Sequence, residues 1–145
     1  MQRPDSWSGR SDTERVDIRR LLWVGPLIVA AAIVANVIFA TIATRIFRIP
    51  DEFLALTPGA IAMFTLFGTV GAVIVFAIVA RFARRPYSLY RKIAIGVLVA
   101  SLIPDLALFW MPEPVGAIEV ILLMITHVIA AGVVVWMLER LTSRR

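Results

Sequence analysis

The sequence predicts an all-α integral membrane protein, a four-helix bundle whose antiparallel helices run up-down-up-down. Two observations carry this prediction. The chain has 145 residues, of which 60% are hydrophobic and 17% are charged, and its mean hydropathy is +0.87. Soluble domains have roughly 45–50% apolar and about 25% charged residues. In addition, four apolar stretches reach about 20 residues, the length that a helix needs to cross a bilayer.

The four stretches divide the chain into one transmembrane domain and two tails. The predicted spans cover about residues 21–44, 58–80, 93–111 and 115–138. They belong to a single domain, residues 18–142, which follows a disordered cytoplasmic tail of residues 1–17 and precedes a short tail of residues 143–145.

Local signals place the ends of the helices. Thr57-Pro58 predicts the start of the second helix, because threonine caps a helix N terminus and proline fits the first helical position. Residues 111–114 include two prolines and cannot continue a helix, so they predict a very short turn between antiparallel neighbours. Residues 81–92 are expected to form a polar loop that is broken by Pro86.

Positive charge marks one side of the membrane. The segments before the first span, between the second and third spans and after the fourth span (residues 1–20, 81–92 and 139–145) share one side of a four-span protein, and they carry 13 of the 15 Lys and Arg residues. Because Lys and Arg accumulate on the cytoplasmic side, both termini should be cytoplasmic. The sequence pI is about 11.0, but the charges flank spans, so we expect contacts with anionic lipid headgroups and none with nucleic acid. The headgroup contacts are expected at Arg81, Arg84, Arg85, Arg91 and Lys92.

Residue counts exclude several chemistries. The chain has no cysteine, so it forms no disulfide, no thiolate nucleophile and no Cys-ligated metal centre. His127 is the single histidine, which excludes a multi-histidine metal site within one chain. The sequence therefore predicts no metal and no cofactor.

Polar residues inside the spans are the candidate functional residues, because ionisable groups within a membrane are costly and mark functional sites by default. At about 1.5 Å per residue, Asp105 lies about 9 Å and His127 about 18 Å below the outer boundary. Each helix places a polar group in the outer half of the bilayer, which indicates a polar pocket that opens outward. The candidate site residues are Asn36, Ser101, Asp105, Glu119, Thr126 and His127.

Pro104 adds a further polar group to this region, since a proline inside a helix frees the carbonyl four residues back. We expect a hydrogen bond from His127 to Ser101 or to the freed Ala100 carbonyl. About 9 Å of depth separates Asp105 from His127, so a contact between them would need a bridging water or a tilt of the helices.

Structural roles compete with functional ones for these residues. As a neutral acid hydrogen-bonded to Asn36, Asp105 would only hold the bundle together, and His127 would then be a packing residue between helices. Glu119 lies near enough to the interface to be merely solvated. Small residues at helical spacing predict close helix packing. The predicted packing residues are Thr65, Gly68, Thr69 and Ala72 on the second span and Pro104 on the third.

Short segments in all four spans resemble one family. They are Ala35-Asn36-Val37, Leu56-Thr57-Pro58-Gly59-Ala60, Ser101-Leu102-Ile103-Pro104-Asp105 and Met124-Ile125-Thr126-His127-Val128-Ile129-Ala130-Ala131. Through them the chain resembles the uncharacterised bacterial family catalogued as domain of unknown function 6069, over about residues 19–142. The resemblance implies a small four-span protein of the bacterial inner membrane, without an activity, ligand or cofactor. The resemblance further implies that Asn36 is the family's polar residue in span one, that Ser101 and Pro104 belong to its Ser-Leu-x-x-Pro segment in span three, and that His127 is its histidine in span four.

Three classes of function fit these residues. We favour a non-enzymatic accessory, assembly or lipid- or small-ligand-binding module, with a homo-oligomer or another membrane protein as its partner. The alternative is an oligomeric small transporter or proton-linked carrier that uses Asp105 and His127. An intramembrane hydrolase would need Ser101 as nucleophile beside these two residues, and a triad is recognised by its geometry and not by sequence.

The charge distribution makes a direct prediction about orientation. Reporter fusions at Arg145 should show cytoplasmic activity, and fusions at Asp51 should show periplasmic activity. A reporter that is active in the periplasm when fused at Arg145 would contradict the predicted orientation.

Overall fold

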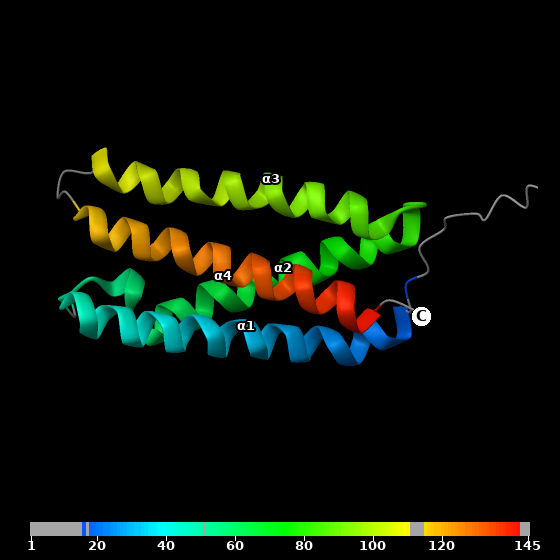
Figure 1. Cartoon of the computed structure of the whole chain (residues 1–145), viewed down its shortest axis with the longest axis horizontal. Coiled ribbons are helices and arrows are strands. Elements are labelled where there is room, and N and C mark those ends of the chain that lie inside the picture. The colour runs from blue at the N-terminus through cyan, green and yellow to red at the C-terminus, as the bar shows by residue number, and fades with distance from the viewer. Residues whose placement is uncertain (1–15, 17, 51, 111–114, 143–145) are drawn as a thin grey trace, which may run out of the picture.

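Four long helices form the bundle in the computed structural model, which describes residues 16, 18–50, 52–110 and 115–142. They are α1 (Ile18–Phe47), α2 (Pro58–Phe82), α3 (Pro86–Ala107) and α4 (Ala117–Thr142). Successive helices run in opposite directions along the long axis (Figure 1). Two short 3-10 helices, η1 (Leu54–Leu56) and η2 (Leu108–Trp110), lie between α1 and α2 and after α3. The predicted all-α four-helix bundle is confirmed.

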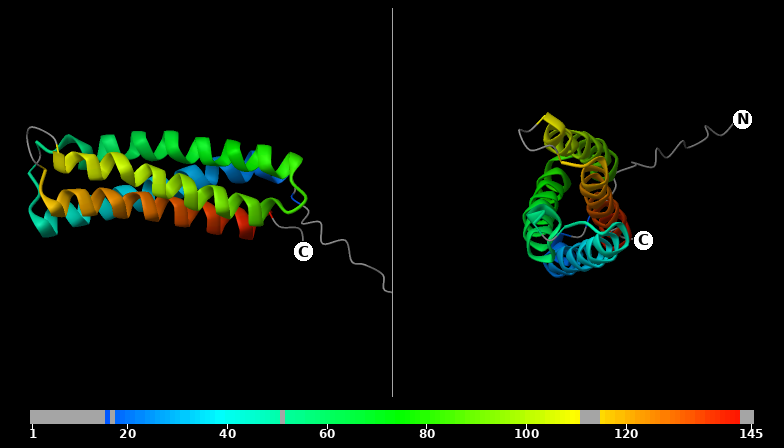
Figure 2. Two further views of the ribbon diagram at one scale, coloured as in Figure 1. Left: turned by 90° about the horizontal axis from the view of Figure 1, so that it is seen from above. Right: turned by 90° about the vertical axis from the view of Figure 1, so that its left-hand side faces the viewer.

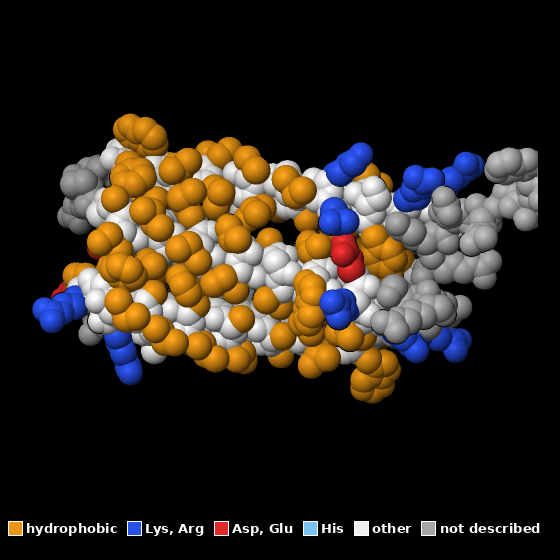
Figure 3. Space-filling view, viewed as in Figure 1, with side chains coloured by type: hydrophobic (Ala, Val, Ile, Leu, Met, Phe, Trp, Pro, Cys, Tyr) orange, Lys and Arg blue, Asp and Glu red, His pale blue; other side chains and the backbone are white. Residues whose placement is uncertain are grey.

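Each of the four helices is long and apolar enough to cross a membrane. Their apolar windows have mean hydropathies between 2.1 and 2.5. Large apolar side chains also point outward on every helix, for example Leu27, Phe67, Ile103 and Trp136, and they cover much of the surface (Figure 3). Such a surface is stable in lipid and not in water. The chain is a small multi-pass membrane protein.

The helix ends follow the local signals with one exception. The Thr57 hydroxyl accepts a hydrogen bond from the Ala60 N–H, and Pro58 is the first residue of α2, as predicted. The expected polar loop over residues 81–92 is wrong in its second half, because α3 begins at Pro86. Proline is tolerated in the first turn of a helix, where its missing N–H would have no partner within the helix, so Pro86 starts a helix here and does not break a loop.

Three predicted segments fall wholly or largely outside the described residues. They are the tail of residues 1–17, of which only Val16 is described, the turn at residues 111–114 and the tail of residues 143–145.

Two apolar clusters hold the bundle together. The first lies at the terminal end, which we define as the end where α1 begins and α4 ends. Phe76 is its centre, fully buried, with ring centroids 5.6 Å from Tyr87 and 5.0 Å from Tyr90. The second cluster lies at the opposite end, where Leu56 of η1 packs with residues such as Ala40 and Leu122.

The third helix packs least tightly against the others. Its only buried residues, among those described, are Pro86 and Tyr90 at the terminal end and Asp105 near the opposite end. Between them, Ile95, Val97 and Val99 are about 60% exposed. Seen along the bundle, α3 lies at the edge away from α1 (Figure 2), and the space-filling surface is hollowed between α3 and α4 near mid-length (Figure 3).

The predicted packing stripe on α2 needs one correction. Thr65 and Thr69 are buried and Ala72 packs against the first cluster, as expected. Gly68, however, is exposed, and a Cβ added there would meet no atom within 4 Å. The spacing of 65, 69 and 72 defines one helix face, and Gly68 lies at its edge, turned outward. Pro104 is likewise exposed, so it is not a packing residue.

The glycine that brings two helices close together is Gly25 of α1. It is buried, and a Cβ there would lie 3.3 Å from Val73 Cγ1 of α2.

Two glycine substitutions test this assignment. Gly25→Leu should destabilise the fold by about 1–3 kcal/mol, because extra methylenes in a packed interface displace their neighbours. Gly68→Leu is the matched control and should change stability little. Thermal unfolding in detergent measures both, and equal losses for the two variants would contradict the packing described for α1 and α2.

Candidate functional site

In the half of the bundle away from the terminal end, polar side chains of different helices meet in two separate pairs. The first pair joins α1 to α2. Asn36 Nδ2 donates a hydrogen bond of 2.9 Å to Thr65 Oγ1, and both residues are buried. Asn36 Oδ1 is also buried and has no hydrogen-bond partner among the described residues. Buried polar atoms of this kind are commonly satisfied by an internal water.

The second pair joins α3 to α4. His127 Nδ1 lies 3.2 Å from Asp105 Oδ2, within ion-pair distance. The Asp105 side chain is 11% exposed and the His127 side chain 38% exposed, so the carboxylate is enclosed and the imidazole is open on one side. The structure therefore brings together the two ionisable residues that the sequence placed at different depths.

This contact corrects two predictions from the sequence. Asp105 does not bond to Asn36, which is paired with Thr65, and the separation of Asp105 from His127 was overestimated. Side chains on a helix lean toward its N terminus. Because α3 and α4 are antiparallel, the Asp105 side chain points toward the middle of the bundle and the His127 side chain points toward the end where α4 begins. The two side chains therefore approach each other along the bundle axis, and their distance is shorter than the distance between the two backbone positions.

A backbone carbonyl fixes the tautomer of the imidazole. His127 Nδ1 lies 3.0 Å from the Leu123 carbonyl oxygen, one turn earlier in α4. A carbonyl can only accept a hydrogen bond, so Nδ1 carries the hydrogen. The hydrogen-bond geometry is met at Leu123 and not at Asp105 Oδ2, which stays without a hydrogen bond within the described part of the chain. The Leu123 carbonyl has no signal in the sequence beyond its position four residues before His127.

The other predicted site residues lie apart from this pair. The Ser101 hydroxyl donates to the Leu98 carbonyl of its own helix at 2.7 Å, so the expected bond between His127 and Ser101 or Ala100 is wrong. Thr126 is buried, and its hydroxyl donates to the Leu123 carbonyl at 2.7 Å. Glu119 is half-buried in the first turn of α4, where its negative charge faces the positive end of the helix dipole.

A second polar contact between α3 and α4 lies at the terminal end. Arg91 Nε is 3.3 Å from Glu139 Oε1, and the Tyr87 and Thr142 hydroxyls are 3.0 Å apart. Polar side chains thus link α3 to α4 near both ends of α3. The pairing of Arg91 with Glu139 was not predicted from the sequence, since both residues could equally have been solvated charges.

The Asn36–Thr65 hydrogen bond yields a stability prediction. Thr65→Val keeps the side-chain shape but leaves Asn36 Nδ2 unpaired, which should cost about 1–3 kcal/mol. Thr69→Val is the control, one turn along the same buried face, because the Thr69 hydroxyl donates only to carbonyls of its own helix. Unfolding in detergent should show the larger loss for Thr65→Val; a larger loss for Thr69→Val would contradict the role of the Asn36 contact.

Comparison with known proteins assigns the family alone. Residues 16–144 match the family described as Family of unknown function (DUF6069). No curated protein and no solved structure matches the chain.

Proposed function

The chain belongs to the family of unknown function DUF6069, and we propose that it is a non-enzymatic membrane module that binds a small cationic ligand between α3 and α4. The observation that carries the proposal is the enclosed Asp105 carboxylate, 3.2 Å from a half-exposed imidazole. A carboxylate and an imidazole within a span are expensive unless they have partners or a function.

The chemistry of the pair indicates the class of ligand. Because Nδ1 donates to the Leu123 carbonyl, a neutral His127 offers Nε2 as an acceptor. Asp105 Oδ2 is a second acceptor without a hydrogen bond in the described part of the chain. Two acceptors select a group that donates hydrogen bonds, and the negative carboxylate favours a positive donor. A primary ammonium group has both properties.

The remaining polar residues support binding over catalysis. A hydrolase of the Ser-His-Asp type needs the serine hydroxyl within hydrogen-bond reach of the imidazole. Ser101 instead donates to Leu98, and the imidazole is engaged by Leu123 and Asp105.

The same proposal includes the location of the protein and its orientation in the membrane. We place it in the bacterial inner membrane with both termini in the cytoplasm, on the grounds of the charge distribution. Lipid surrounds its four spans, and a second copy or another membrane protein is its proposed partner.

A proton-linked carrier is the second candidate, and the contact of Asp105 with His127 favours it. An acid and an imidazole in contact can pass a proton between them, as chains of such residues do in pumps and transporters. In this second proposal the bound cation is a proton, and Asp105 and His127 transfer it.

The single histidine permits a one-site test. The protein is labelled with 15N-histidine, placed in phosphatidylcholine nanodiscs, and titrated with methylammonium chloride and with tetramethylammonium chloride. Methylammonium should shift the His127 imidazole signals saturably. Tetramethylammonium has the same charge but no N–H to donate, and it should shift them little.

Two variants separate a specific site from a general charge effect. Asp105→Asn should weaken methylammonium binding by about 10- to 100-fold, the equivalent of one hydrogen bond to a charged group at about 1.5–3 kcal/mol. Glu119→Gln removes a nearby acid outside the pair and should leave binding unchanged. Equal shifts from the two cations, or none from either, would contradict the ammonium proposal; proton flux in proteoliposomes that is lost in Asp105→Asn would then favour the carrier.

A further inference from the structure

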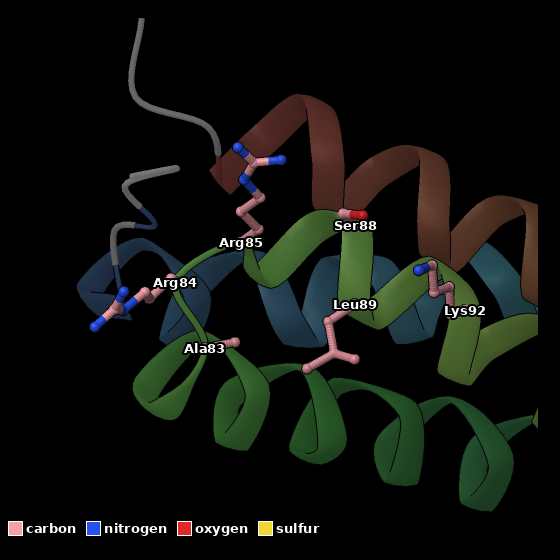
Figure 4. A pocket seen from close by; sticks show the side chains of 6 residues that line it. All are labelled: Ala83, Arg84, Arg85, Ser88, Leu89 and Lys92. Carbon is pink, nitrogen blue, oxygen red and sulfur yellow. The ribbon is translucent and has the colours of Figure 1, made fainter. Parts of the chain in front are cut away.

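The terminal end of the bundle contains an open cavity of about 490 Å³, a volume within the usual range for small-molecule sites. Six residues line it where α2 ends and α3 begins (Figure 4). They are Ala83, Arg84, Arg85, Ser88, Leu89 and Lys92. Three of these residues are cationic, one is a hydroxyl donor and none is acidic.

The fold concentrates positive potential at this cavity. Arg84 and Arg85 lie in the loop, whereas Ser88 and Lys92 are one turn apart on the same face of α3 (Figure 4). Arg85, the N-cap residue of α3, and Ser88, in its first turn, both line the cavity, so the positive end of the helix dipole lies beside it. The N terminus of a helix, basic side chains and a hydroxyl together form a suitable site for a phosphate group.

The neighbouring basic residues are arranged differently. Arg91, between Ser88 and Lys92 in sequence, pairs with Glu139 on α4, and Arg81 lies in the last turn of α2 outside the cavity lining. The five basic residues that the sequence assigned to headgroup contacts are therefore not equivalent. Three of them line one cavity, whereas Arg91 and Arg81 do not line it.

We propose that this cavity binds the phosphate of an anionic phospholipid headgroup. Its position carries the choice of a lipid over a free phosphate. The cavity adjoins the ends of two apolar spans, where headgroups lie, and its lining includes the apolar side chains of Ala83 and Leu89. Phe82, next to the cavity in sequence, is 79% exposed and is positioned to meet acyl chains. Phosphatidylglycerol has the required chemistry, with one negative phosphodiester and a hydroxylated headgroup.

The test counts bound lipid on the intact protein. Detergent-solubilised protein is titrated with phosphatidylglycerol, phosphatidylcholine or inorganic phosphate, and bound ligand is measured by native mass spectrometry. Phosphatidylglycerol should bind with the lowest apparent Kd. Arg84→Gln with Lys92→Gln should raise that Kd by about 30-fold, the equivalent of about 1 kcal/mol for each basic residue near the headgroup.

A matched pair of charges serves as the control. Arg81→Gln with Arg140→Gln removes the same net charge, but neither residue lines the cavity. In buffer of about 1 M salt, where the Debye length is about 3 Å, this control should change the Kd by less than about threefold. Circular dichroism without lipid checks that both double variants remain folded. An equal loss of binding in the two double variants would overturn the proposal, as would equal binding of phosphatidylcholine. Binding of inorganic phosphate as strong as that of the lipid would also overturn it, because the ligand would then be a free anion.

Discussion

An acid within a membrane span needs a partner, and in this bundle the contact between Asp105 and His127 provides one. Exposing an aspartate to lipid costs about 2.5–3.5 kcal/mol on insertion scales at the middle of a span, and less near the end of a helix, where Asp105 lies. That cost favours an arrangement in which α3 presents Asp105 to α4 and not to lipid. The Leu123 carbonyl accepts a hydrogen bond from the same imidazole nitrogen, Nδ1, and so holds the ring in place beside the carboxylate. Near this end of α3, where Asp105 is the buried residue, the rotation of the helix about its axis thus depends on a polar contact.

The weak packing of α3 gives polar contacts an unusual weight in this structure. In water, apolar burial would decide where a helix lies, but lipid is as apolar as the helix surface and supplies no such force between helices. The helices α1, α2 and α4 nevertheless pack closely against one another, through the buried side chains of two clusters. The third helix buries little between its ends and is linked to α4 by Asp105 at one end and by Arg91 at the other. Both proposed binding sites lie along α3, one near each of these links.

The sequence was sufficient for the fold and for part of the candidate site. The four spans, the start of α2 at Pro58 and the interior position of Asn36, Thr65 and Asp105 follow from hydropathy, capping and the cost of polar groups in lipid. The pairing of those residues did not follow. A depth counted along each helix treats a side chain as a point at its Cα, so it placed His127 too far from Asp105. Spacing alone also cannot give the rotation of a helix to within one residue, so it places Gly68 on a packed face and gives no signal for the close approach at Gly25. Pro86 was read as a loop breaker because a proline after basic residues fits a loop and a helix start equally well.

The most direct test of the account is a distance between Asp105 and His127 in a lipid bilayer. Solid-state NMR on protein labelled with 15N-histidine and 13C-aspartate measures the dipolar coupling between the imidazole Nδ1 and the carboxyl carbon. The Nδ1–Oδ2 distance of 3.2 Å places the carboxyl carbon near enough to Nδ1 for a measurable coupling. This coupling should be absent from Asp105→Asn prepared with the same labelled amino acids and with unlabelled asparagine. A wild-type protein with no resolved coupling would show that α3 and α4 are not joined by this contact, and the proposed ligand site between them would be lost with it.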